Sequence, residues 1–186
     1  MHPLIQRLIL DHKRLLILLK VLKQQLDDFQ AGSEHDLDLA CELIQYLQAY
    51  ENLVHHPVEE LIFSKFLARL ETDHNALQNA MQQHRLLTTM THKFHNTLES
   101  IIQGVVIPRA EVNTQGQNLL KNLFEHVQLE ELQIFPELNS GLTHADWLYL
   151  EDQVTITKDP LFEHPDSNRF RNLLNHLTTI ATNHNS

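Results

Sequence analysis

Residues 126–136 read HVQLEELQIFP and place a histidine and a glutamate one helical turn apart. If this segment is helical, His126 and Glu130 share the face that carries Leu123, which is the face a helical bundle buries. Burying an unpaired carboxylate is costly, so a cation must meet Glu130. Imidazole nitrogen and carboxylate oxygen together suit iron, zinc or manganese. This segment therefore predicts a metal site inside a helical core.

The composition bounds the class of protein. The 186-residue chain has the length of one domain, and its 4 Gly and 6 Pro with scattered β-branched residues favour long helices, so the predicted class is all-α. A formal charge of −10 disfavours nucleic acid and anionic membrane surfaces as partners. No apolar run approaches the ~20 residues of a membrane span. The single Cys41 and the charged residues near the N-terminus, where a secretory signal would be apolar, indicate a reduced, cytoplasmic protein.

Apolar residues recur at helical spacing in four long segments, predicted at about residues 4–29, 34–70, 72–103 and 111–138. Glycines at Gly32 and Gly104 mark two of the turns between them. Short connections make neighbouring helices antiparallel, so we predict an up-down four-helix bundle over residues 1–140. Residues 141–186 are too short to bury a core of their own, and we expect them to pack on the bundle as a helical appendage of the same domain.

A histidine interrupts the apolar stripe of every segment, and two segments add a glutamate one turn later. These candidate metal ligands are His12, His55, Glu59, His84, His126 and Glu130. Residues equally far from a connecting turn lie level in antiparallel helices, which rise ~1.5 Å per residue. Counted from the predicted turns, all six fall in one layer. Six polar groups in one slice of a core would be unsatisfied unless they hold a metal.

One ambiguity concerns the second segment. His56 and Glu60 repeat the same four-residue spacing one position further along. The phase of the stripe favours His55 with Glu59. Pro57 removes a backbone hydrogen bond inside this helix and should bend it. Such a bend could turn His56 and Glu60 inward instead, so the sequence leaves this choice open.

Four stretches of the chain match one known family: LDHKRLLILL around His12, HHPVEELIF from His55, QQHRLL around His84, and HVQLEELQIFP from His126. Together with the tail motifs ADW and DPLF, they resemble the hemerythrin-like family, or HHE cation-binding domain, and within it a bacterial single-domain subgroup.

The resemblance implies a centre of two non-haem iron ions with terminal histidine ligands and bridging carboxylates. By motif position, the terminal ligands are His12, His55, His84 and His126, and the bridges are Glu59 and Glu130. Thr88 stands where the oxygen-carrying hemerythrins have a further histidine. A set of four histidines resembles the sensor and repair branches of the family rather than the oxygen carriers.

Three functions remain open at this point. The favoured one is a protein that binds or senses a small ligand, namely oxygen, nitric oxide or peroxide, or that buffers iron. The alternative is an enzyme that reduces nitric oxide or peroxide, or an iron donor for iron-sulfur cluster repair. The third is a metal-stapled structural bundle that docks a protein partner or a second copy, for example through the apolar segment 15–22. The sequence does not decide among them.

Overall fold

The protein is a bundle of helices. The computed structural model describes residues 1–33, 35–70, 74–155 and 157–183, with side chains up to residue 180, and its regular structure within these ranges is helical, without β-strands. The α-helices are α1 (Pro3–Ala31), α2 (Leu37–Tyr46), α3 (His56–Leu67), α4 (Asn75–Ile102), α5 (Arg109–Leu129), α6 (Phe135–Gly141), α7 (His144–Gln153) and α8 (Arg171–Asn183). Two π-helical segments, η1 (Leu47–His55) and η2 (Glu130–Ile134), lie between α2 and α3 and between α5 and α6.

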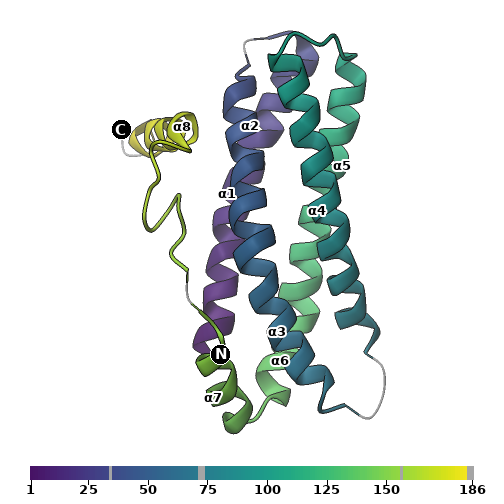
Figure 1. Ribbon diagram of the computed structural model, residues 1–186, viewed down its shortest axis with the longest axis vertical. Helices are drawn as coiled ribbons and strands as arrows, with labels where there is room; N and C mark the ends of the chain where they lie inside the picture. The colour runs from purple at the N-terminus through teal and green to yellow at the C-terminus, as the bar shows by residue number, and fades with distance from the viewer. Residues whose placement is uncertain (34, 71–73, 156, 184–186) are drawn as a thin grey trace.

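The long helices lie side by side along one axis (Figure 1). The segments α2, η1 and α3 form one continuous rod, as do α5, η2 and α6, and these rods pack with α1 and α4. The predicted helical segments therefore correspond to observed ones, with ends displaced by a few residues. The predicted starts at residues 34 and 72 lie outside the described residues.

The turn after α1 shows why the chain reverses there. Gly32 adopts a left-handed conformation with φ of 73°, which glycine reaches at no steric cost. Its N–H and that of Ser33 bond back to carbonyls in the last turn of α1, closing the helix. Asp36 then caps α2, because its side chain accepts a hydrogen bond from the backbone N–H of Leu39.

A proline explains the first π-helical segment. Pro57 has no N–H to donate, and its ring would collide with the carbonyl four residues earlier in a regular α-helix. The chain relieves this conflict by adding a residue to the preceding turn, so that the N–H of His56 bonds to the carbonyl of Glu51, five residues back. Where the sequence predicted a bend at Pro57, the structure has a π-helical turn.

The same device recurs at the second π-helical segment. Pro136 follows Phe135, whose N–H bonds to the carbonyl of Glu130, again five residues back. Both π-helical segments lie at the height of the polar layer, where they alter which side chains face the core.

The core consists of two apolar clusters with polar residues between them. One cluster includes Leu8, Phe63 and Phe135, and the other includes Leu15, Leu87 and Leu123. His12 lies on α1 between Leu8 and Leu15, so the layer of buried polar side chains has apolar packing on both sides.

The C-terminal segment packs on the bundle at two places. Trp147 and Leu150 of α7 join one apolar cluster, and Phe170 and Leu173 join the other. Figure 1 shows α7 at one end of the bundle and α8 lying against its side. Among the described helices, none combines the length and the apolar character of a membrane span.

Candidate metal centre

The structure brings all six candidate ligands together. His12 comes from α1, His55 from η1, Glu59 from α3, His84 from α4, His126 from α5 and Glu130 from η2. None of these residues is more than 3% exposed. The predicted common layer is therefore present.

Glu59 lies between two groups of histidines. Its Oε1 is 3.1 Å from the Nε2 of His55 and 3.6 Å from the Nε2 of His12. Its Oε2 is 3.4 Å from the Nε2 of His84. One carboxylate thus presents its two oxygens to two different sets of imidazoles, as a bridge between two ions would.

Glu130 completes the same pattern from the opposite rod. Its Oε2 is 3.3 Å from the Nε2 atoms of both His12 and His126, and its Oε1 is 3.3 Å from the Nε2 of His84. The two glutamates therefore contact overlapping sets of histidines.

Each of the four predicted histidines is oriented by an acceptor behind it. The pairs formed by the Nδ1 atoms are His12 with Glu131 at 3.1 Å, His55 with Asp11 at 3.4 Å, His84 with Glu60 at 3.1 Å and His126 with Gln83 at 3.0 Å. An acceptor at Nδ1 favours the tautomer whose lone pair is on Nε2. All four imidazoles thus present Nε2 to the two glutamates.

These four acceptors were not identified from the sequence, although their positions follow a simple pattern. Each is adjacent in sequence to a candidate ligand but bonds a histidine on another helix: Asp11, Gln83, Glu60 and Glu131. A residue beside an inward-facing ligand is rotated toward the neighbouring helix, so polar neighbours of ligands were the available signal.

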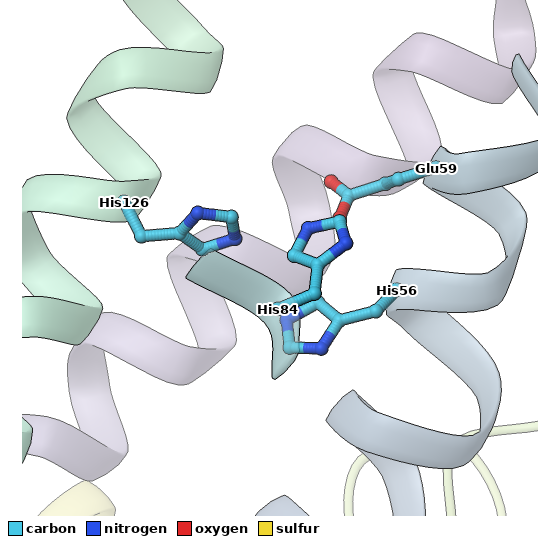
Figure 2. Close-up of side chains that lie close together, drawn as sticks. All are labelled: His56, Glu59, His84 and His126. Atoms are coloured by element: carbon cyan, nitrogen blue, oxygen red, sulfur yellow. The ribbon is translucent and has the colours of Figure 1, made fainter. Parts of the chain in front are cut away.

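His56 also faces the centre, so the structure buries both histidines of the pair between which the sequence left the choice open. It is 5% exposed, and its ring stacks on that of His84 with centroids 4.2 Å apart. Figure 2 shows His56, Glu59, His84 and His126 lying close together. The two adjacent histidines are both buried where the π-helical segment ends. Glu60 remains at the edge, with its side chain 39% exposed.

Two groups of these side chains have donor atoms close enough for one ion each. His12, His55 and Glu59 form the first group, and His56, Glu59, His84 and His126 form the second. Within each group the donor atoms lie within 4.8 Å of one another. Glu59 belongs to both groups, so the arrangement is that of two neighbouring sites.

Unsatisfied atoms provide the test of whether a metal fits here. Buried atoms without a hydrogen-bond partner include the Nε2 atoms of His12, His55 and His126, both carboxylate oxygens of Glu59, and Oε2 of Glu130. Buried polar atoms are nearly always paired in folded proteins. Their lone pairs converge on the same space, and imidazole with carboxylate is a donor set that suits iron, so the residues fit a metal.

The electrostatics of the centre follow from burying acids beside imidazoles. Burial lowers the pKa of His12 and His55, but the neighbouring carboxylates outweigh it and hold both pKa values well above their usual value. Burial raises the pKa of Glu59, yet His55 and His12 hold it well below its ordinary range. For His56, burial and the nearby His84 both lower the pKa, which favours a neutral imidazole. The carboxylates are thus held as anions, the form that binds a cation.

The comparison with protein families is consistent with this geometry. Residues 4–138 match the hemerythrin HHE cation binding domain. The chain belongs to the hemerythrin HHE cation-binding family. The match runs from α1 into α6, and the buried histidines and glutamates of this hemerythrin-family centre all lie inside it. A comparison with curated proteins gave no match.

Proposed function

We propose that the protein holds two non-haem iron ions in this centre and uses them to bind or sense a small molecule, namely oxygen, nitric oxide or peroxide, or to buffer iron. The observation that carries the proposal is the convergence, in the buried layer, of histidine nitrogens and glutamate oxygens that have no hydrogen-bond partner. Bound iron would supply an electron-rich site that cycles between ferrous and ferric states. The chain's own residues supply the ligands, their orientation and the exclusion of water.

The ligands divide between the two ions. The first ion would be held by His12 and His55, and the second by His84, His126 and the additional His56. Glu59 and Glu130 would bridge them, because each carboxylate contacts histidines of both groups. The oxygen carriers have a further histidine at the position where this chain has Thr88. His56 would supply the fifth imidazole in its place.

A cavity beside the first group supports a small, weakly polar ligand. It has a volume of about 170 Å³, and His55 lies in its wall. The apolar residues that line it include Leu4, Leu8, Val54 and Val58, and the polar ones include Arg7, Asp11 and Tyr50. Its lining is mostly apolar, which favours uncharged diatomic molecules over ions. The segment 15–22 gives less support to a docking function, because Leu15, Leu18 and Leu22 are buried.

The alternative function is an enzyme that reduces nitric oxide or peroxide at the same centre. A chain of hydrogen bonds favours it. Arg7 donates to the hydroxyl of Tyr50, Tyr50 donates to Asp11, and Asp11 bonds His55. Such a chain places a hydroxyl and a carboxylate next to a proposed ligand, where a reducing enzyme needs a source of protons.

We also propose the arrangement of the whole chain. Residues 1–140 would form an antiparallel up-down four-helix bundle, because the turns between the long rods are short. Residues 141–186 would belong to the same domain, since Trp147 and Phe170 are buried in the bundle's apolar clusters.

Anaerobic reconstitution followed by metal analysis tests the proposal. We expect about two iron ions per chain and an optical spectrum that changes on adding oxygen, nitric oxide or peroxide. A stable adduct supports binding or sensing, while multiple turnover supports the enzyme. One zinc ion, or no tightly held metal after iron loading, contradicts the di-iron centre.

A further inference from the structure

Among the buried carboxylates outside both groups of candidate ligands, Glu51 lies beside a histidine of the first group. Glu51 lies in η1, one turn before His55, and is 3% exposed. Resting on the di-iron function proposed above, we infer that Glu51 is a third carboxylate of the centre, a terminal ligand of the ion held by His12 and His55. The first ion would then have two histidines and one terminal carboxylate, and the second would have three histidines.

The position of Glu51 relative to His55 supports this assignment. Its Oε2 lies 3.9 Å from the Nε2 of His55. The other ring nitrogen, Nδ1, faces Asp11. Glu51 therefore lies on the side of His55 that faces Glu59, the side where the first ion would lie.

The carboxylate of Glu51 also lacks the partners that a structural acid would have. Its Oε1 is buried and has no hydrogen-bond partner. Among the described residues, its ion-pair contact is with His55, while Arg7 bonds Asp11 and Tyr50 instead. A buried carboxylate without a cation or hydrogen bonds is strongly unfavourable. A metal ion beside it removes this penalty.

The backbone gives a second, independent argument. The sequence from Glu51 to Pro57 has five residues between glutamate and proline, and so does the sequence from Glu130 to Pro136. In both cases the carbonyl of the glutamate accepts the i→i−5 hydrogen bond of the π turn. Glu51 therefore occupies, in its rod, the position relative to the π turn that Glu130 occupies in the other.

The charges around Glu51 are consistent with a cation site. Burial has the largest effect and raises the pKa of Glu51. Among the charged groups that act on it, His55 and His12 favour its anion, and Asp11 and Glu59 oppose it. These neighbours come from α1, η1 and α3, so Glu51 faces the first group of ligands rather than a surface. With no Lys or Arg among these groups, a metal is the cation that this position fits.

The test replaces the carboxylate by an amide of the same shape. In competition with a chelator, Glu51→Gln should bind one of the two irons at least about 10-fold more weakly. Even substitution of a residue that only hydrogen-bonds a metal ligand lowers metal affinity about 10- to 100-fold. One of the two iron environments resolved by Mössbauer spectroscopy should change or disappear. Metal-free Glu51→Gln should be at least as stable to heat as metal-free wild type, because the amide removes an uncompensated charge.

Glu125→Gln provides the matched control. It removes the same charge one residue before His126, but the Glu125 side chain is 56% exposed and pairs with Lys121. This variant should retain both irons with wild-type affinity. If the Gln variant at position 51 does not fold, Glu51→Met, an apolar side chain of similar volume, repeats the measurement.

The outcomes separate this inference from the proposed function. If wild-type protein binds two irons and Glu51→Gln retains both with unchanged affinity and spectra, Glu51 is not a ligand and the inference fails alone. If wild-type protein binds no iron, the di-iron function itself fails. A loss confined to one iron in Glu51→Gln, absent in Glu125→Gln, supports both.

Discussion

The Nδ1 atom of His55 lies 3.4 Å from Oδ2 of Asp11, while the Nε2 atom of the same ring lies 3.1 Å from Oε1 of Glu59. The ring is thus held between a carboxylate behind it and a carboxylate in front of it. Asp11 fixes the orientation and the tautomer of His55 and makes Nε2 a better donor. Asp11 therefore positions His55 while lying outside both groups of candidate ligands.

Asp11→Asn should therefore weaken iron binding by about 10- to 100-fold, as substitutions of a residue that hydrogen-bonds a metal-ligating histidine usually do. Chelator competition on the iron-loaded protein measures the effect. Asp27→Asn on the same helix is the control, because its side chain is 46% exposed. Equal affinities in wild type and Asp11→Asn would show that His55 does not need this partner.

The two glutamates that contact both groups of histidines should be the most sensitive positions. Glu59→Ala or Glu130→Ala should lose at least one iron per chain, because a bridging carboxylate contacts both ions and its removal leaves excess positive charge in a dry site. Metal analysis after gel filtration measures the stoichiometry. Full occupancy in either variant would mean that the bridge has been assigned to the wrong residue.

The stability of the metal-free protein should depend on pH. Burial lowers the pKa of His84, but Glu130 and Glu59 raise it to about 10, so its protonation stabilises the fold fully below pH 6.5, and this contribution is lost as the pH rises toward 10. Burial raises the pKa of Glu51 to about 7, so its ionisation destabilises the fold increasingly as the pH rises from 4.5 to 7. Both effects lower the stability of the metal-free protein as the pH rises.

The melting temperature of the metal-free protein should thus fall by about 4 °C or more between pH 6.5 and 9.5. Iron affinity should rise over the same interval, because binding displaces protons from the histidines. His84→Gln should make this fall smaller, while His12 and His55, whose pKa values are also raised, should maintain the rest of it. A melting temperature that rises with pH would contradict this account.

Access to the first group of ligands should depend on the apolar cavity. Val58 lines it, and Val58→Phe should fill part of its 170 Å³ and slow the binding of nitric oxide about 10-fold without lowering the iron content. Stopped-flow absorbance measures the rate. Leu132→Phe, at a side chain that is 73% exposed, should leave it unchanged. An unaltered rate in Val58→Phe would mean that the ligand enters elsewhere.

The sequence predicted the helical rods and the six candidate ligands because both depend on periodicity alone. Counting along an α-helix was sufficient for His12, His84 and His126, which lie on regular α-helices. It was insufficient for His56, because the π turn before Pro57 adds a residue and changes which side chains face the core. Glu51 lies one turn before His55, so the same counting places it on the buried face, although it was not among the predicted ligands. Pro57 indicated that the helix would be distorted, but the residues alone did not predict that the distortion would be a π turn.

The last prediction concerns His56 and Thr88, which line the same small cavity of about 120 Å³ next to His84. His56→Ala should weaken the second iron at least about 10-fold, because it removes one of three proposed imidazole ligands. Thr88 lies one turn after His84, where a histidine would point toward the same ion. Its hydroxyl donates to the carbonyl of His84 and is a weak metal ligand compared with imidazole.

Adding Thr88→His to His56→Ala should therefore restore the affinity for the second iron. The centre would again have five imidazoles, with the fifth supplied by α4 instead of α3. Adding Thr89→His to His56→Ala is the control, since residue 89 is exposed and lies on another face of the helix. Iron titration with chelator competition distinguishes the two double variants. If neither recovers the lost affinity, the side chain at position 88 does not reach the ion. If both recover it, added histidine binds iron nonspecifically, and the proposed exchange between positions 56 and 88 is wrong.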